Sequence, residues 1–215
     1  MTTTLPSVDA TATPTITAMP EDGTSGVRHA VLRDGTRVVV RPIRPDDADR
    51  ERRFIEALSP QVRRFRFLDT INIPSADLLR QMTVVDPATG VAYVAVIGAG
   101  SQEQQIGVAR FSAEPAGPAC EFAVTVSDAW QGKGLGTLLM RRLVEEARRR
   151  GIDTLHSSDA ADNELMRRFA AHLQLQHYRD PQDATMVLYS LDVRLSTLLD
   201  AAPAPGTEAP QTPGA

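Results

Sequence analysis

The amino-acid sequence predicts one α/β (α+β) domain in which about six to seven strands form a sheet and about four helices flank it. Three observations support this fold class. A strand-turn-strand pattern surrounds Asp34-Gly35, three β-prone runs follow one another over residues 91–126, and a glycine-rich loop then leads into a long amphipathic helix. The 215 residues, 42% of them hydrophobic, suit a single domain with a sizeable core.

The first expected elements are a hairpin and two helices. Asp34-Gly35 separates two β-prone runs in H-A-V-L-R-D-G-T-R-V-V-V-R-P-I, which is a strong hairpin pattern. A helix is expected over residues 45–58, because Pro45 is followed by two acidic residues and Ser59-Pro60 ends the apolar pattern. A second, short helix is expected over residues 74–82.

Three strands are then expected over residues 91–97, 105–111 and 119–126. Alternate residues of a strand point to opposite faces of the sheet. One face of the third strand is apolar and should belong to the core, with Cys120, Phe122, Val124 and Val126. The other face is small and polar, with Glu121, Ala123, Thr125 and Ser127.

The loop from Gln131 to Gly136 is the most informative stretch of the chain. Its three glycines, Gly132, Gly134 and Gly136, allow sharp turns that point several backbone N–H groups at the start of the next helix. Unpaired amides and the positive end of the helix dipole favour a phosphate or diphosphate there. The P-loop pattern is absent, and Thr137 stands where a Rossmann fingerprint needs its third glycine. A ligand-free glycine turn would add chain entropy for no local gain, so a bound phosphate group is the better interpretation.

The remaining elements follow from periodicity and turn residues. Leucine and alanine recur at helical spacing after the loop and predict a buried stripe, formed by Leu135, Leu138, Leu139, Leu143 and Ala147. We then expect a strand over residues 152–156, a helix over 162–173 and a closing strand over 184–191.

The two ends of the chain differ in composition from its middle. Residues 1–26 are rich in Thr, Ala and Pro and nearly uncharged, and residues 196–215 are rich in Ala and Pro. Neither segment offers enough apolar surface to offset the entropy lost on ordering. The sequence therefore predicts disordered tails at 1–26 and 196–215 around a folded domain at 27–195.

Composition excludes several classes of partner. The 23 Lys and Arg against 27 Asp and Glu give a net charge of −4, so neither nucleic acid nor an anionic membrane is expected as a partner. Cys120 is the only cysteine, which rules out an internal disulfide and fits a reducing compartment. No Cys/His cluster suggests a metal, and no apolar run reaches the ~18 to 20 residues of a membrane span. Because the first residues also lack the pattern of a signal peptide, we expect a cytoplasmic protein.

The glycine loop resembles the acyl-CoA loop of the GNAT superfamily of N-acetyltransferases, whose pattern is Q/R-x-x-G-x-G/A. Gln131, Gly134 and Gly136 fill this pattern, and Gly132 and Lys133 occupy its free positions. The order of elements from about residue 28 to 194 is also similar to that of the family. The resemblance implies a GNAT fold, with a mixed, mostly antiparallel sheet that opens beside the acyl-CoA.

The resemblance also implies a set of contacts to acetyl-CoA, a cosubstrate that needs no metal. The pantetheine amides would pair with the backbone of the opened strand at Val124 and Val126. Asn163 matches a family asparagine that touches the cofactor arm, although an ordinary helix N-cap explains it equally well. The expected cofactor contacts are Val124, Val126, Gln131, Gly132, Lys133, Gly134, Leu135, Gly136, Thr137 and Asn163.

Several segments are more specifically similar to the acetyltransferase domain of bacterial Pat-type protein lysine acetyltransferases. They are L-R-D-G-T-R-V-V-V-R-P-I-R-P-D-D, L-S-P-Q-V-R-R-F-R-F, G-V-A-R-F, E-F-A-V-T-V and W-Q-G-K-G-L-G-T-L-L-M. This resemblance implies a protein lysine as the acceptor. It also makes Phe65 and Phe67 candidate walls of the acceptor site, although two ordinary core aromatics are the simpler interpretation.

Glu121 is the candidate catalytic residue. Attack of an amine on a thioester needs a neutral amine, yet a free lysine has a pKa of about 10.4, so a base is required. Glu121 lies on the polar face of the strand expected beside pantetheine, about 20 Å of extended chain before Ser127 and the loop. The Pat-type resemblance points to the same residue. The alternative is an ordinary strand carboxylate, exposed or ion-paired.

Some positions depart from the family, and they keep other functions open. Many GNAT enzymes have a tyrosine on the helix after the next strand, where this chain has Phe169; Tyr178 is a weak substitute. The common Leu-Gly-Phe is replaced by Leu173-Gln174-Leu175. Lys133, the only lysine, either adds charge beside a phosphate or is simply exposed. The alternatives are therefore an acetyltransferase for a small amine, or an acyl-CoA-binding regulator without turnover, as a monomer or homodimer.

Overall fold

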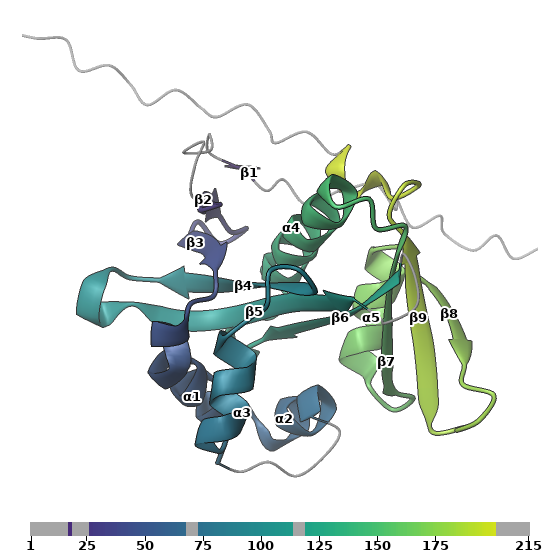
Figure 1. Ribbon diagram of the computed structural model, residues 1–215, viewed down its shortest axis with the longest axis horizontal. Coiled ribbons are helices and arrows are strands. Elements are labelled where there is room, and N and C mark those ends of the chain that lie inside the picture. The colour runs from purple at the N-terminus through teal and green to yellow at the C-terminus, as the bar shows by residue number, and fades with distance from the viewer. Residues whose placement is uncertain (1–16, 19–25, 68–72, 114–118, 201–215) are drawn as a thin grey trace, which may run out of the picture.

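Figure 1 shows the computed structural model, which describes residues 17–18, 26–67, 73–113 and 119–200. Nine strands form one sheet in the order β1-β2-β3-β4-β5-β6-β7-β9-β8 within these ranges. Among them β6 and β7 are the one parallel pair, and all other neighbours are antiparallel. The predicted mixed, mostly antiparallel sheet is thus confirmed. The strands are β1 Thr17–Ala18, β2 Arg28–Val31, β3 Arg37–Pro42, β4 Gly90–Ile97, β5 Gln104–Ala113, β6 Ala119–Val126, β7 Thr154–Ala160, β8 Gln176–Arg179 and β9 Met186–Asp192.

Helices cover both faces of the sheet (Figure 1). The α-helices of the described residues are α1 Ala48–Ala57, α2 Pro60–Phe67, α3 Ala76–Thr83, α4 Leu135–Arg149 and α5 Glu164–His172. Short 3-10 turns are η1 Pro45–Asp47, η2 Gly100–Gln102, η3 Asp128–Trp130 and η4 Thr197–Leu199. One core cluster joins the sheet to α4, and the other joins α1 and α3 to its opposite face. The central strands are therefore buried on both sides.

Most sequence-predicted elements are present with small changes in their ends. The hairpin turns at Gly35, whose φ of +83° suits a glycine. The helix expected over residues 45–58 starts as the η1 turn and continues as α1. The strand expected over residues 119–126 is β6.

Three strands or helices of the described ranges were not predicted. The first is β1, Thr17–Ala18, which pairs with β2 although it lies in the segment expected to be a disordered tail. Helix α2 occupies a segment for which no helix or strand was expected, and its first residue is Pro60, which was expected to end the preceding helix. Proline suits the first turn of a helix, since the N–H it lacks would have no partner there. Strand β8 was missed because all four of its residues are exposed at the sheet edge, which leaves no apolar alternation to detect.

Most residues of the two predicted tails lie outside the described ranges, so the disorder expected there stays a prediction. The described part nevertheless continues past residue 195. Leu198 and Leu199 of η4 pack against the main core, and Arg148 of α4 donates to the Ser196 carbonyl at 2.5 Å. No helix in the described ranges is long and apolar enough to cross a membrane.

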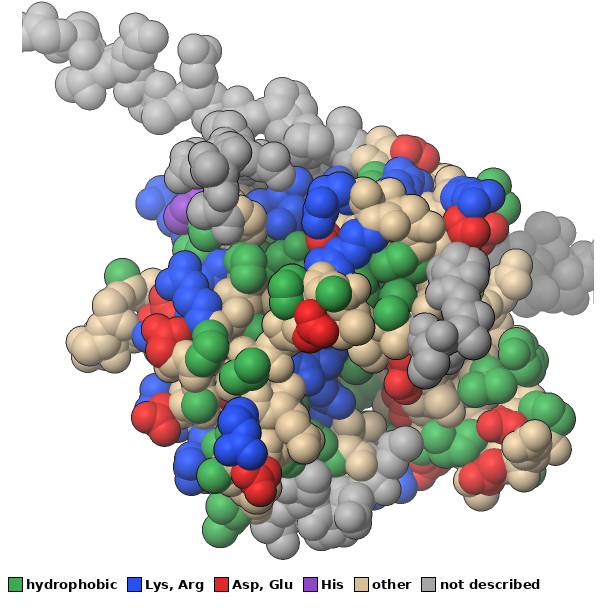
Figure 2. Space-filling model, viewed as in Figure 1, with side chains coloured by type: hydrophobic (Ala, Val, Ile, Leu, Met, Phe, Trp, Pro, Cys, Tyr) green, Lys and Arg blue, Asp and Glu red, His purple; other side chains and the backbone are tan. Residues whose placement is uncertain are grey.

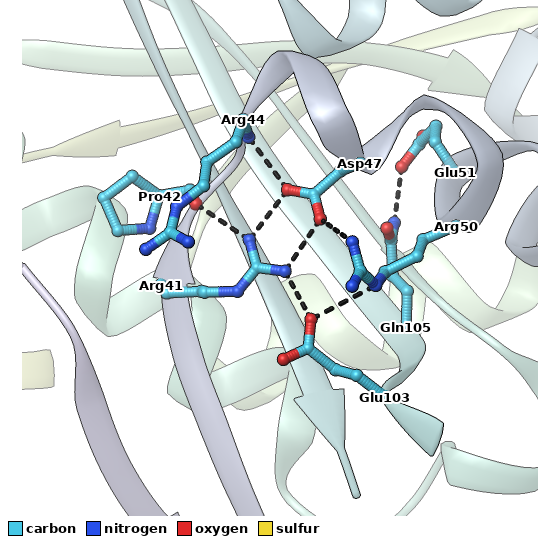
Figure 3. Close-up of polar contacts among 8 residues, drawn as sticks. All are labelled: Arg41, Pro42, Arg44, Asp47, Arg50, Glu51, Glu103 and Gln105. Atoms are coloured by element: carbon cyan, nitrogen blue, oxygen red, sulfur yellow. Dashed lines mark hydrogen bonds and ion pairs between the residues drawn. The ribbon is translucent and has the colours of Figure 1, made fainter. Parts of the chain in front are cut away.

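A buried ion network fixes the start of α1 to the sheet (Figure 3). Both terminal nitrogens of Arg41 on β3 donate to the two carboxylate oxygens of Asp47 at 2.7 Å. Glu103 accepts from Arg41 at 2.6 Å, and Arg50 of α1 lies 3.0 Å from Asp47. Burial alone would raise the pKa of Asp47, but hydrogen bonds from Arg41 and the Arg44 amide hold that pKa below its ordinary value.

Candidate active site

The sheet opens between its two parallel strands. Strands β6 and β7 pair only at Ala119↔Thr154, Cys120↔Leu155 and Glu121↔His156, and beyond these pairs β6 has no strand neighbour on that side. The Ser127 amide donates to Ile106 on β5, whereas the Val126 carbonyl accepts from the Gln131 side chain at 3.2 Å. Since backbone groups alternate between the two edges of a strand, those of Val124 and Val126 lie on the opened edge.

The glycine loop leads from β6 through η3 into α4. Gly132 and Gly134 have φ values of +72° and +90°, in the left-handed region that favours glycine. Gly136 serves a different purpose: a Cβ there would lie 3.1 Å from the ring of Phe169 on α5, so glycine allows the two helices to approach. No side chain caps the start of α4 at Gly134. The first amides of α4 are thus available to an anion.

One cavity of about 530 Å³ connects the loop, the opened edge of β6 and Glu121. Figure 2 shows the surface hollowed between α2 and β7, with basic side chains on one side of the hollow and acidic ones on the other. Nine of the predicted site residues line this cavity: Glu121, Val124, Val126, Gln131, Gly132, Gly134, Gly136, Thr137 and Asn163. Their contacts with a cofactor stay predictions, but the fold brings them to one place.

Two predicted cofactor residues do not line the cavity. Leu135 is a core residue that is 1% exposed, so only its backbone amide in the first turn of α4 is placed to meet a ligand. The Lys133 ammonium pairs with Asp34 at 3.0 Å and lies 4.5 Å from the centre of the Trp130 ring. The Thr36 amide and Lys133 lower the pKa of Asp34 to about 2. Arg33, beside Asp34 in the hairpin turn, lines the cavity instead of Lys133.

Asn163 caps α5 and also lines the cavity, while its contact with the cofactor arm stays a prediction. Its side-chain oxygen accepts from the Met166 amide at 3.1 Å and caps α5, which confirms the capping interpretation. Its side-chain nitrogen donates to Asp159 at 3.0 Å. Burial raises the pKa of Asp159, and the bonds from Asn163 and the Ala160 amide oppose that rise.

The aromatic residues divide between the cavity and the core. Phe65 lines the cavity, whereas Phe67 packs against the second core cluster. Tyr178 is 58% exposed on β8 and does not line the cavity. Within the described ranges the wall contains no tyrosine, and no group of three or more His, Cys, Asp or Glu is arranged to hold a metal ion.

Comparison with known proteins decides the family. The acetyltransferase (GNAT) domain family matches residues 37–176. The chain belongs to the GNAT family. It is therefore an acyltransferase, and GNAT membership implies an acyl-CoA as its donor substrate. The GNAT fold and the family resemblance predicted from the sequence are both confirmed.

Individual relatives support this assignment. The chain is 41% identical to an acetyltransferase of Pseudomonas aeruginosa over 160 residues, which are 74% of this chain and 86% of that protein. It is 29% identical to the acetyltransferase Pat of Mycolicibacterium smegmatis over 163 residues, 75% of this chain but 47% of Pat. This GNAT chain thus spans about half the length of that relative. The GNAT domain of S. lividans PAT aligns with a TM-score of 0.71 at 28% identity, covering 80% of this chain and 99% of that domain.

Several residues of the cavity wall were missed from the sequence. Arg33, Arg66 and Asp159 line it, yet they come from a hairpin turn, from α2 and from the end of β7. Helical spacing in Val62, Phe65 and Arg66 would have placed these three on one face of a helix. The position of Asp159 at the end of a strand beside the sheet opening was also detectable, whereas nothing local singles out Arg33.

Proposed function

We propose that this GNAT domain transfers an acetyl group from acetyl-CoA to the side-chain amine of a protein lysine, with Glu121 as general base. The observation that carries the proposal is the single cavity that has the glycine loop at one end and Glu121 at the other. Phosphate binding and base catalysis need different chemical groups, and groups suited to each line the cavity along one strand.

The donor has a defined path in this proposal. The diphosphate binds the amides of Gly132, Gly134 and the first turn of α4, where the helix dipole favours negative charge. Pantetheine lies along the opened edge of β6 and pairs with the backbone of Val124 and Val126. The extended chain from Glu121 to the loop covers about 20 Å, which brings the thioester close to the carboxylate.

The reaction then follows from the groups present. Glu121, which is exposed on β6, takes a proton from the lysine ammonium, directly or through a water molecule. The neutral amine attacks the thioester carbonyl, and a backbone amide of the opened β6 edge stabilises the oxyanion. The C–S bond breaks, the nitrogen loses its second proton, and the CoA thiolate is protonated because thiols titrate near ~8.5. Glu121 releases its proton to solvent.

The lysine acceptor has separate support. It comes from the resemblance of several segments, among them E-F-A-V-T-V with Glu121, to Pat-type protein lysine acetyltransferases. The matches to M. smegmatis Pat and to the S. lividans PAT domain are consistent with it.

A thiol-release assay with acetyl-CoA and lysine-containing protein tests the proposal. The Glu121→Gln variant should lose about 10²- to 10⁴-fold in kcat, the usual contribution of general base catalysis. Calorimetry should show CoA binding unchanged. Glu56→Gln is the matched control, since Glu56 is an exposed carboxylate on α1 outside the cavity.

The same assay separates the rival functions. Release with small amines but with no protein lysine would favour a small-molecule acetyltransferase. CoA binding without release from any amine or protein would favour a non-catalytic regulator. If the Glu121→Gln variant retained wild-type turnover, the assignment of the base would be wrong.

A further inference from the structure

Arg66 is a charged wall residue that the proposed reaction does not use. It belongs to the last turn of α2 and lines the same cavity as Glu121, together with Val62 and Phe65 of its helix. Its side chain is half-buried. The basic side of the hollow in Figure 2 lies toward α2.

The hydrogen bonds of α2 distinguish Arg66 from its neighbours. Arg64 pairs with Asp162 at 2.7 Å, and Arg63 donates to the carbonyls of Glu56 and Leu58. Arg66 makes no hydrogen bond or ion pair with any residue in the described ranges, and its guanidinium carbon lies 5.2 Å from the centre of the Phe67 ring. As far as the described ranges go, its donors are available to a ligand in the cavity.

The charges around Arg66 leave it protonated and only partly compensated. Burial and, to a smaller extent, the charge of Arg110 lower the pKa of Arg66 to about 10, against the opposing effect of Glu51 and Glu121. Glu51 is fully buried and accepts from Gln105 at 2.5 Å, and Arg110 donates to the Met82 carbonyl. At neutral pH Arg66 is therefore a cation facing a cavity whose wall carboxylates have other roles: Glu121 is needed as the base, and Asp159 accepts from Asn163 and the Ala160 amide.

We propose that Arg66 binds a carboxylate carried by a substrate, and so selects an acidic acyl chain or an acidic acceptor. This proposal rests on the proposed function. A guanidinium matches a carboxylate with two parallel hydrogen bonds. A phosphate of CoA is the poorer partner here, because the glycine loop that would hold the diphosphate lies about 20 Å along the chain from Glu121.

Two substrate pairs distinguish the possible sources of the carboxylate. The first pair is acetyl-CoA and succinyl-CoA with one neutral peptide acceptor. The second is acetyl-CoA with two peptides in which lysine is followed by Glu or by Gln. In one of the pairs the wild type should prefer the acidic member about tenfold or more in kcat/KM, as expected for a charge-assisted hydrogen bond.

Substitution of Arg66 should remove this preference selectively. Arg66→Met keeps an unbranched apolar side chain, and should lower kcat/KM for the acidic substrate about tenfold or more while changing the neutral one less than about threefold. Arg66→Lys should retain part of the preference, because it keeps the charge but loses the fork of donors. Arg64→Met is the matched control on the same helix, pointed at Asp162 rather than the cavity, and should keep the wild-type preference.

Other results would overturn the assignment. Equal use of both members of both pairs by the wild type would exclude a carboxylate ligand, as would an Arg66→Met variant that slows acidic and neutral substrates alike. An unchanged calorimetric titration with CoA shows that a variant is folded. If no substrate turns over, the proposed function fails, and the role of Arg66 is then tested by binding alone. Equal affinity of the wild type for both acyl-CoAs and for both peptides would overturn that role.

Discussion

Gln174 takes up a backbone conformation that glycine would adopt at lower cost. It follows α5 with a φ of +56°, the one positive φ of a non-glycine residue in the described ranges. The Leu175 amide donates to the Ala170 carbonyl across this turn at 2.9 Å. Leu173-Gln174-Leu175, which stands where Leu-Gly-Phe is common in the family, therefore still ends the helix with a left-handed residue.

This conformation gives a stability prediction. Gln174→Gly should raise the free energy of unfolding by about 1 kcal/mol. A left-handed residue with a Cβ costs roughly 1–2 kcal/mol, which glycine removes, and the larger unfolded-state entropy of glycine cancels part of that gain. Urea denaturation measures the change. Gln174→Ala is the control and should bring no gain, since alanine keeps the strain; a gain of the same size would assign the effect to the lost glutamine side chain.

Two glycines with similar positive φ values allow the effect of a substitution on stability to be told apart from its effect on ligand binding. Gly132 lies in the cavity loop with φ +72° and Gly100 in η2 with φ +58°, and a Cβ at either would meet no atom within 4 Å. Alanine at each should cost about 1–2 kcal/mol of stability through strain alone. Only Gly132→Ala should also weaken CoA binding in a calorimetric titration. Equal CoA affinity of the two variants would argue against the loop as the phosphate site.

At the scale of elements, the sequence predicted features that depend on neighbouring residues and missed features that depend on tertiary packing. Strand β6 and the glycine loop were predicted because alternation and glycine spacing are local properties. Arg33 and Arg66 were missed because only the fold brings the hairpin turn and α2 to the cavity. For the same reason the sequence left the role of Lys133 open, since its partner Asp34 lies on the distant hairpin.

The ion network at the start of α1 predicts an acid-sensitive attachment. Asp47 is 1% exposed and paired with Arg41, so Asp47→Asn should cost about 3 kcal/mol, because the buried guanidinium then keeps Glu103 as its one carboxylate partner within the described ranges. The folded-state pKa of Asp47 is depressed, so its contribution is present above the unfolded value of about 3.9 and is lost as the pH falls through the lower folded value.

Urea denaturation of wild type and variant at several pH values measures both effects. The stability difference between them should shrink as the pH falls below about 3.9. Asp49→Asn on the exposed side of α1 is the control and should change stability by less than about 0.5 kcal/mol at neutral pH. A loss for Asp47→Asn that did not depend on pH would assign the effect to packing instead of charge.

At the scale of the whole molecule, the position of the site depends on the one parallel contact in an otherwise antiparallel sheet. Pairing of β6 and β7 ends at Glu121 and His156, so the sheet stays continuous on one side of Glu121 and opens on the other. The loop, the free strand edge and α5 all surround this opening. The family resemblance implied such an opening in the sequence analysis, but its start at Glu121 depends on strand register, which no local pattern encodes.

The end of the folded domain gives a last prediction. A chain ending at residue 200 keeps η4, whereas a chain ending at residue 195, the boundary predicted from composition, loses Leu198, Leu199 and the Ser196 carbonyl that Arg148 binds. The shorter chain should be less stable by about 2–3 kcal/mol, because it gives up two partly buried leucines and a charged hydrogen bond. Urea denaturation of both chains measures this loss. Because η4 packs on α4 away from the cavity, saturating CoA should raise the stability of both chains by the same amount. This result would mean that η4 supports the fold without acting on the site.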